Sequence, residues 1–315
     1  MRDFPQTAVE LRDWFATEQD CREYLAELRW PEGMRCPACG AAEIWTMKVP
    51  FYRCACCGHD FTVTAGTLFA DTHKPLRLWF EAIWYITNQK SGVSALGVQR
   101  VLGLGSYRTA WNWMHKLRRA MVRPGRDRLA GMVEVDETFL GGPQPGKRGR
   151  GAAGKTLVVI AAQVDGRKIG RIRLARVADA SAASLEPVVQ QAIEPGTQVL
   201  TDDWQGYSGL GALGYQRQVV RRTAELGDNL LPRANRIAAL LKRWLLGTHQ
   251  GAVRPEHLDY YLDEFTFRFN RRNSRSRGLL FYRLLEQAVH LAPVKGEELV
   301  GGRPLPPPQP PTNSS

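Results

Sequence analysis

The hydrophobic pattern divides the chain near residue 130. Before this point apolar residues recur every three or four positions, which predicts helices over residues 7–29, 75–90, about 94–102 and 106–121. After it, short apolar runs alternate with polar positions and predict strands over residues 131–138, 155–164, 170–178 and 197–202, with a helix at 181–193 before the last strand. The pattern therefore indicates an α/β protein with a helical amino-terminal part.

Further elements follow residue 202. A short basic strand is predicted over residues 215–222, and helices over 231–247, 255–272 and 278–291. Phe265, Phe267 and Phe269 alternate near the end of the second of these helices, which predicts a change to extended chain there. Glycine and proline dominate residues 293–315, so we expect a disordered tail.

The order of elements in the second half is β-β-β-α-β. This is the order of the ribonuclease H-like fold, in which acids from the first and fourth strands converge. We therefore predict an α/β ribonuclease H-like domain with a mixed sheet. The expected organisation is a helical segment over 1–30, a cysteine-rich module over 31–70, a helical region over 71–125, the α/β domain over 128–292 and the tail over 293–315.

Two of the predicted strands lead into aspartates. Asp136 lies in GMVEVDETFLGG, and Asp202 in TQVLTDDWQGY. A carboxylate near a core strand needs a cation, a hydrogen-bond donor or a metal ion. If the two strands are neighbours, the carboxylates meet at one edge of the sheet and can share a divalent cation, for which Mg²⁺ or Mn²⁺ is best suited. The alternative is that each acid merely ends a strand and points into water.

Five of the six cysteines fall between residues 36 and 57. Cys36 and Cys39 form one pair, Cys54 and Cys57 another, and a glycine follows each pair, which is typical of tetrahedral Cys₄ zinc sites. We predict a structural zinc ribbon, because four protein ligands leave no open position for water. Cys56 and His59 are alternative ligands, although Cys57 keeps the two-residue spacing that Cys56 breaks. Unligated core cysteines would not require paired spacing.

The formal net charge is +12, from 43 Lys and Arg against 31 Asp and Glu, which points to a polyanionic partner. No apolar run reaches the ~18 residues of a membrane-spanning helix, and the amino terminus lacks the apolar core of a signal peptide. We therefore expect a cytoplasmic protein without a membrane partner, and double-stranded DNA is favoured over an acidic lipid surface.

Residues 94–121 have the pattern of a helix-turn-helix, with a glycine turn and Ser106 capping the second helix. The alternative is an ordinary helical hairpin with a solvated charged face. Two other basic segments are candidate phosphate contacts, a glycine-rich loop between the first two strands and an arginine cluster after residue 270. The alternative for the loop is a solvated, disordered segment. The candidate DNA-binding residues are Arg108, Asn112, Lys116, Arg119, Lys147, Arg148, Arg150, Arg271, Arg272 and Arg275.

Several of these segments together resemble a known family. The cysteine module CPACG…YRCACCGHDFTVTAGTLF, the strand VEVDETFLGG, the segment TDDWQGY and the run LLKRWLLGTHQGAV…YLDEFTFRFNRR are similar to bacterial insertion-sequence transposases of the ISXO-like group. That group joins an amino-terminal zinc ribbon to a DDE-type catalytic domain. The resemblance covers about residues 10–290.

The resemblance also implies a set of catalytic residues. The family's two catalytic aspartates fall on Asp136 and Asp202, its third position on Asn235, and its lysine on Lys242. Where many DDE enzymes have glutamate, this chain has an amide, which offers a carbonyl oxygen but no charge, so a second ion is expected to be held more weakly. The implied cofactors are two Mg²⁺ or Mn²⁺ ions, held by Asp136, Asp202 and Asn235, and one structural Zn²⁺.

The implied function is transposition of an insertion sequence. The protein is expected to bind terminal inverted repeats, cleave the 3′ end of the element and join it to target DNA by two-metal phosphoryl transfer. It is also expected to form a homo-oligomer on DNA and to associate with the bacterial nucleoid. Two alternatives are an inactive, transposase-derived DNA-binding repressor and a structure-selective nuclease of the same fold.

Overall fold

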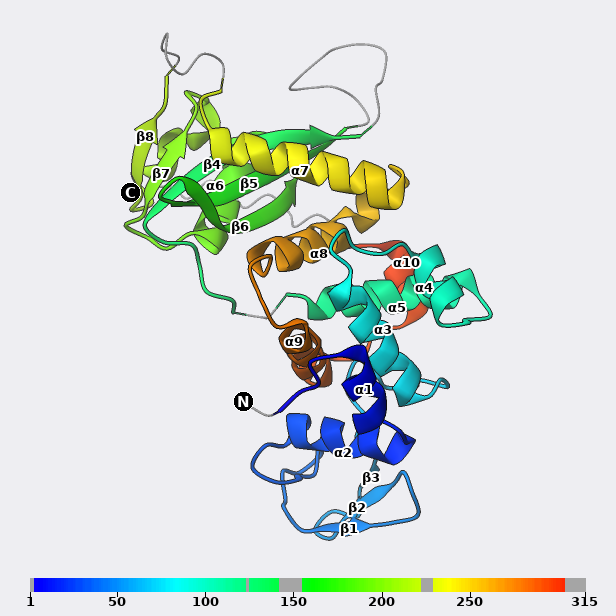
Figure 1. The fold of residues 1–315 in the computed structure, drawn as a ribbon. Coiled ribbons are helices and arrows are strands. Elements are labelled where there is room, and N and C mark those ends of the chain that lie inside the picture. The colour runs from blue at the N-terminus through cyan, green and yellow to red at the C-terminus, as the bar shows by residue number, and fades with distance from the viewer. Residues whose placement is uncertain (1–2, 123–124, 142–154, 222–228, 304–315) are drawn as a thin grey trace. The chain divides into compact units, whose positions relative to one another are not determined.

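The computed structural model describes residues 3–122, 125–141, 155–221 and 229–303. The chain forms two compact units (Figure 1). The first contains residues 1–123 and 274–300, and the second contains residues 124–273 and 301–315. The predicted loop residues Lys147, Arg148 and Arg150 lie outside the described part of the chain.

The first unit is built from helices around an aromatic core. Phe15 contacts Phe80 at 4.7 Å between ring centroids, and Phe80 contacts Phe281 at 5.7 Å, so three helical segments meet at this point. Trp79 and Trp113 stack at 3.7 Å. The helices are α1 (Ala8–Trp14), α2 (Glu18–Arg29), α3 (Leu76–Asn88), α4 (Ala95–Val101), α5 (Tyr107–Ala120), α9 (Arg277–His290) and α10 (Gly296–Gly301).

The single helix predicted over residues 7–29 is wrong, because the chain breaks between α1 and α2. Thr17 begins α2 with a capping box: its hydroxyl accepts from the Asp20 amide, and the Asp20 carboxylate accepts from the Thr17 amide. Phe15, just before the break, is buried. The amphipathic pattern continues through both helices and therefore does not predict the break. The signal for the break is the capping box at Thr17.

The predicted end of the α/β domain at residue 292 is too late, since α9 belongs to the first unit and packs with α2, α3 and α5. The expectation of disorder from residue 293 is also wrong up to residue 303. Leu299 of α10 is fully buried, and Arg303 pairs with Asp263 at 2.6 Å. The proline-rich residues 304–315 lie outside the described residues.

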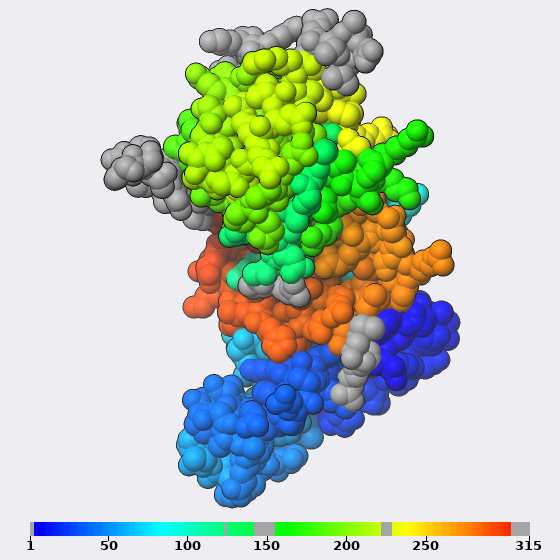
Figure 2. All heavy atoms as spheres, turned by 90° about the vertical axis from the view of Figure 1, so that its left-hand side faces the viewer, coloured from blue at the N-terminus to red at the C-terminus, as the bar shows by residue number. Residues whose placement is uncertain are grey.

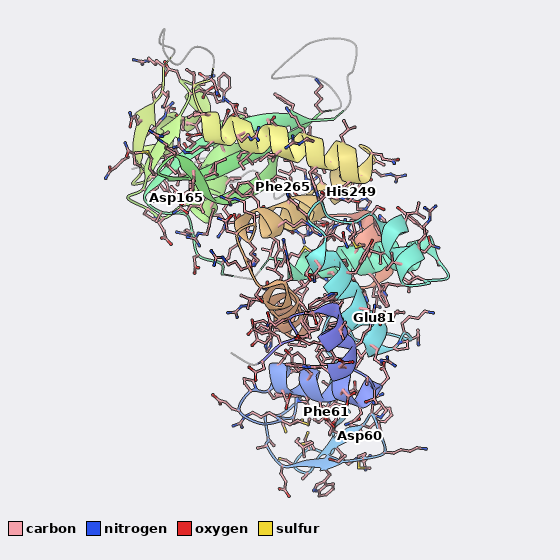
Figure 3. All side chains as sticks on the ribbon, viewed as in Figure 1. Asp60, Phe61, Glu81, Asp165, His249 and Phe265 are labelled. Carbon is pink, nitrogen blue, oxygen red and sulfur yellow. The ribbon has the colours of Figure 1, made fainter. Side chains whose placement is uncertain are left out.

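A small three-stranded sheet lies in the amino-terminal half of the first unit. Its strands are β1 (Ile44–Thr46), β2 (Tyr52–Cys54) and β3 (Asp60–Phe61), paired antiparallel in the order β1-β2-β3. Figure 2 shows this segment, in light blue, as a protruding lobe of its unit. Asp60 and Phe61 of β3 are labelled in Figure 3. The side chain of Phe61 is buried against Tyr52 and Trp30.

The second unit contains a mixed five-stranded sheet in the order β6-β5-β4-β7-β8. Strands β4, β5 and β6 form an antiparallel meander, whereas β7 runs parallel to β4, and β8 runs parallel to β7. The chain order β-β-β-α-β agrees with the sequence pattern. The elements are β4 (Met132–Leu140), β5 (Thr156–Asp165), β6 (Lys168–Val177), α6 (Ala182–Ala192), β7 (Gln198–Thr201), η1 (Gln205–Leu210), β8 (Gln216–Val219), α7 (Pro232–His249), η2 (Pro255–His257) and α8 (Leu258–Asn270).

Helices cover both faces of this sheet, because alternate strand residues are apolar on either side. Val133 and Val135 face one core with Leu185 of α6 and Tyr207 of η1. Val158 and Ile160 of β5 face the other core with residues of α7 and α8. Figure 1 shows α7 crossing this second face.

The extended chain predicted near Phe265, Phe267 and Phe269 is wrong, because α8 continues as a helix to Asn270. Phe265 and Phe269 are one turn apart and stack at 6.2 Å between ring centroids. Phe267 is also buried. The alternating phenylalanines thus belong to a helix that has apolar contacts on more than one side. Figure 3 labels Phe265 on α8.

No helix in the described ranges combines the length and the apolar character needed to cross a bilayer.

Candidate catalytic site and zinc centre

Asp136 lies in β4, and Asp202 directly follows β7, the strand that pairs with β4. Met132 of β4 pairs with Gln198 of β7, an offset of 66 positions (198 − 132), and the same offset relates Asp136 to Asp202. The strands are parallel, so continuing this register two residues past its last pair, Glu134 and Leu200, brings the two aspartates side by side. The condition for a shared cation site, neighbouring strands, is therefore met.

Both aspartates also belong to the same face of the sheet. Val135 and Val199 face the core beneath α6, whereas Leu140 and Leu200 face the core beneath α7. Side chains alternate along a strand, so Asp136 has the orientation of Leu140, and Asp202 that of Leu200. Asp136 is half-buried, and its Oδ1 accepts a hydrogen bond of 2.8 Å from the next backbone amide. The two carboxylates are thus directed to the α7 side.

Glu134 fixes the start of α7 over this face. Its side chain is almost completely buried, and one carboxylate oxygen accepts from the backbone amides of Arg233 and Ala234 at 2.7 and 2.9 Å. The other oxygen accepts from the Arg233 guanidinium at 2.9 Å. A carboxylate at a helix amino terminus satisfies free N–H groups and interacts favourably with the helix dipole. Glu134 therefore holds the helix beside Asp136, two residues further along β4.

The third and fourth predicted catalytic residues lie on α7. Asn235 is the residue after Ala234, so the contact with Glu134 places it next to the sheet. Its amide nitrogen donates to Asn229 Oδ1 at 2.9 Å, which leaves the carbonyl oxygen as the group for a metal. Lys242 follows two turns later and is exposed, while Ile237 and Leu241 are fully buried on the core face of the helix. Helix α7 therefore has a buried core face and an exposed face that contains Asn235 and Lys242.

Lys242 borders a cavity of about 550 Å³. Phe139 and Thr156 also line this cavity. Partial burial lowers the pKa of the Lys242 ammonium group, and the positive charge of Lys155 contributes in the same direction. Lys155 and Lys242 thus add positive charge near the end of β4.

The loop after β7 is held by a residue that the sequence did not single out. Arg217 of β8 donates to Thr201 Oγ1 at 3.1 Å and to the carbonyl oxygens of Asp202 and Trp204, each at 3.2 Å. Asp202 Oδ1 accepts from the Trp204 amide at 3.1 Å. The loop conformation, and with it the position of Asp202, is therefore fixed from the neighbouring strand.

Glu137 lies on the opposite side of β4 from Asp136. The hydroxyl group of Tyr207 donates to Glu137 Oε2 at 2.8 Å. Burial raises the pKa of the Tyr207 hydroxyl well above its ordinary value, and the charge of Glu137 raises it further. Asp203 is exposed and pairs with Arg221 at 3.3 Å. Both acids thus have protein partners away from the α7 face.

The four predicted zinc ligands lie together in the first unit. The sulfur atoms of Cys36, Cys39, Cys54 and Cys57 are all within 4.8 Å of one another. The sulfurs of Cys36 and Cys57 are 3.7 Å apart, and those of Cys39 and Cys54 are 3.6 Å apart. Tetrahedral Zn–S bonds of ~2.3 Å require sulfurs about 3.8 Å apart, so the cluster fits a structural zinc ion.

The backbone turns tightly after each cysteine pair, at the glycine that follows it. Gly40 and Gly58 have φ of 77° and 71°, and their amides donate to the carbonyl oxygens of Cys36 and Cys54. Cys56 is exposed and is not part of the cluster. His59 stacks on Phe61. Of the alternative ligands Cys56, Cys57 and His59, it is therefore Cys57 that belongs to the cluster.

The candidate DNA contacts on α5 differ in exposure. Ser106 caps the helix, as predicted, through a hydrogen bond from the Arg108 amide. Arg108 is exposed near the amino terminus of the helix, whereas Asn112, Lys116 and Arg119 are half-buried. Burial lowers the pKa of the Lys116 ammonium group. The amino-terminal end of α5 is consequently its most accessible part.

The arginine cluster after residue 270 crosses the boundary between the two units. Arg271 and Arg272 stack on Phe267 and Phe269 at 4.2 and 4.0 Å. Arg272 also donates to carbonyl oxygens of Ile169 and Gly170, which ties the end of α8 to β6. Arg275 is exposed and lies in the first unit. Arg272 therefore has a structural partner, while Arg275 is accessible to solvent.

Comparisons with known proteins agree with this arrangement. Residues 128–270, which contain the sheet, α7 and α8, match the model of the ISXO2-like transposase domain. This segment is similar to an ISXO2-like transposase domain. Residues 16–60 match the model of the transposase zinc-ribbon domain, and all four clustered cysteines lie within this range.

A relative matches most of the chain. An uncharacterized protein in transposable element ISH50 of Halobacterium salinarum is 26% identical over 277 residues, which cover 81% of this chain and 91% of the relative. The similarity to this protein of a transposable element thus extends beyond either of the two domain matches. The sequence did not predict the contact of Glu134 with α7 or the role of Arg217, because both depend on which elements become neighbours in the fold.

Proposed function

We propose that the protein is the DNA transposase of an insertion sequence, with a ribonuclease H-like catalytic domain that cleaves the 3′ ends of the element and joins them to target DNA. The observation that most supports this proposal is the parallel register of β4 and β7, because its continuation past Glu134 and Leu200 brings Asp136 and Asp202 together. The transposase-domain match supports the reaction class.

Asp136, Asp202 and Asn235 are the residues that would hold divalent cations. Two hard carboxylates and one amide oxygen suit Mg²⁺ or Mn²⁺. When bound, such cations activate a water or a 3′-hydroxyl group for attack on phosphate and stabilise the leaving oxygen. The neutral Asn235 contributes less charge than a glutamate would, so the aspartates dominate the attraction.

The other side chains orient the DNA and the helix. Lys242 contacts a phosphate near the cleaved bond as a point charge. Glu134 keeps α7, and hence Asn235 and Lys242, at the sheet edge. The exposed amino-terminal end of α5 contacts the DNA in a helix-turn-helix mode, in which residues at the start of the second helix approach the bases. Arg108 is the described residue best placed for this contact.

Cleavage of a defined DNA tests the proposal. The substrate is a duplex carrying the inverted repeats that flank the reading frame, incubated with the full chain and Mg²⁺. The expected product is a nick at the 3′ end of the element, followed by joining to a second duplex. Nicking without joining would instead identify a structure-selective nuclease.

A non-catalytic repressor is the second candidate, and Asn235 is the observation that favours it. An amide at the third position weakens the charge of the site. A repressor would bind the terminal repeats with undiminished affinity and show no cleavage in Mg²⁺ or Mn²⁺. We further propose that the protein self-associates on DNA, because two element ends must be brought together before joining.

A further inference from the structure

An exposed apolar surface lies on one face of the zinc-ribbon sheet, in the lobe that protrudes from its unit (Figure 2). Side chains alternate along β1 and β2, so the face opposite the buried Phe61 presents Trp45, Met47 and Phe51. These three side chains are 54%, 40% and 51% exposed, and Val49 at the tip of the hairpin is 59% exposed. Four large apolar residues are therefore gathered on one hairpin and are accessible.

The register of the hairpin gives this face an apolar half and a charged half. The Met47 amide donates to the carbonyl oxygen of Phe51 at 3.0 Å, so these two residues lie opposite each other. Trp45 pairs with Arg53, and Arg53 pairs with Asp60 of β3. The Arg53 guanidinium donates to both carboxylate oxygens of Asp60 at 2.6 Å. We call this surface, formed by the four apolar residues and the ion pair, the outer ribbon face.

The charge of the ribbon argues against DNA as the occupant of this face. Residues 32–61 contain three Lys and Arg and three Asp and Glu, so the other residues carry the whole formal charge of +12. When Zn²⁺ is bound, four thiolates give the centre a net charge of about −2. Surfaces that bind DNA are much more positive than this. The one arginine of the outer ribbon face already pairs with Asp60. The face therefore lacks the excess positive charge that a phosphate backbone requires.

The outer ribbon face instead suits a second copy of the chain. Trp, Phe and Met are enriched at protein–protein interfaces. Copies related by a two-fold axis meet through the same patch, which must then be complementary to itself. An arginine beside an aspartate meets this condition, because a two-fold axis can set Arg53 of each copy against the partner's Asp60. Two chains of charge +12 repel each other, and the repulsion is least where their near-neutral ribbons meet.

We propose that the outer ribbon face forms a two-fold contact between two copies of this chain. This inference rests on the proposed function, because it names the surface for the self-association on DNA. An aromatic side chain has about 150–250 Å² of surface, so two half-exposed rings contribute far less than the ~800 Å² per partner of a stable interface. The contact is therefore weak in the free chain. It becomes stronger when DNA holds two copies close together, because the effective concentration rises.

Sedimentation equilibrium of the full chain without DNA tests the contact. Val49→Asp places a charge on both sides of the axis, and we expect it to weaken self-association about tenfold or more. Val9→Asp is the matched control, since Val9 is 65% exposed on α1, and it is expected to leave self-association unchanged. A zinc content of one ion per chain in both variants shows that the ribbon is folded. Equal self-association of both variants and the wild type would overturn the proposal.

Reversal of single charges tests the pairing across the axis. Arg53→Asp gives a face with two acids, and Asp60→Arg gives a face with two arginines, so each variant alone is expected to lose self-association. A mixture of the two is expected to form a heterodimer, because an acidic face then meets a basic one. Loss of the pair within one chain would weaken both variants without restoring association in the mixture. A mixture that stays monomeric would therefore overturn the two-fold contact.

The remaining outcomes separate this inference from the proposed function. Cleavage of single terminal-repeat duplexes in Mg²⁺ by a wild-type chain that neither self-associates nor pairs two duplexes would overturn the ribbon contact alone. Weaker binding of a single duplex by Val49→Asp, at concentrations where the chain is monomeric, would assign the face to DNA and overturn the contact. Self-association with the expected response to each variant, but without cleavage in Mg²⁺ or Mn²⁺, would support the contact and contradict the proposed function.

Discussion

At the residue scale, Glu134 connects the sheet to the helix that completes the site. It lies two positions before Asp136, and its carboxylate accepts three hydrogen bonds from Arg233 and Ala234. The sequence shows an acid in a strand but not its partner, which is a hundred residues away. The aspartates are different, since their places in two predicted strands and the family resemblance together make them candidates before the fold is known.

Removing the Glu134 carboxylate should destabilise the second unit. Glu134→Ala leaves buried amides and the Arg233 guanidinium without their acceptor, and we expect a loss of about 3–5 kcal/mol in the free energy of unfolding. Urea denaturation followed by tryptophan fluorescence measures the loss. Glu194→Gln, at an exposed position, is the control and should change stability by less than about 0.5 kcal/mol. Equal stability of both variants would contradict the role given to Glu134.

Asn235 determines how strongly the site attracts cations. Asn235→Asp adds a negative charge beside two carboxylates without changing the size of the side chain. We expect the Mg²⁺ concentration for half-maximal cleavage to fall several-fold, because ligand charge tunes cation affinity. A Mg²⁺ titration of the cleavage rate measures this. An unchanged half-maximal concentration would show that residue 235 does not approach the metals.

At the element scale, the sequence predicted which segments form helices and strands better than where they end. The break between α1 and α2 depends on Thr17, and the helical course of α8 through Phe265 and Phe269 depends on apolar contacts across the fold. The buried Leu299 explains why a helix forms in a glycine-rich segment. These features arise from tertiary contacts that local periodicity does not contain.

The zinc ribbon allows a matched comparison of cysteines. Cys54→Ser removes a member of the cluster and should reduce bound zinc from about one ion per chain to near zero. Cys56→Ser changes an exposed cysteine outside the cluster and should retain the ion. Elemental analysis of the purified variants measures the ratio of zinc to protein. Loss of zinc in Cys56→Ser alone would reverse the ligand assignment.

Helix α5 should contact DNA through its exposed end. Arg108→Ala is expected to weaken binding of the terminal repeats and to reduce the slope of log affinity against log salt by about 1, as for the loss of one phosphate contact. Arg119 has a buried Nη1, so Arg119→Ala should lower stability more than affinity. Titrations at several salt concentrations separate the two. An unchanged salt slope in Arg108→Ala would remove this residue from the interface.

At the scale of the whole molecule, two units share one chain that passes between them more than once. The first unit contains the zinc ribbon and also α9, which follows the segment that matches the transposase domain. Residues 301–303 belong to the second unit again. Hydrophobic pattern alone placed α9 in the α/β domain, because sequence order does not show which core receives a helix. The order of strands and helices along the chain was predicted from the hydrophobic pattern, whereas the order of strands within the sheet was not.

The central claim is that the alignment of Asp136 with Asp202 forms the site of phosphoryl transfer. Its most direct test is cleavage of a terminal-repeat duplex in Mg²⁺ by the wild-type protein and by Asp136→Asn, with binding measured in parallel. We predict that Asp136→Asn slows cleavage by on the order of a thousandfold and leaves affinity for DNA within a few-fold of the wild type. Cleavage by Asp136→Asn at the wild-type rate would contradict the account.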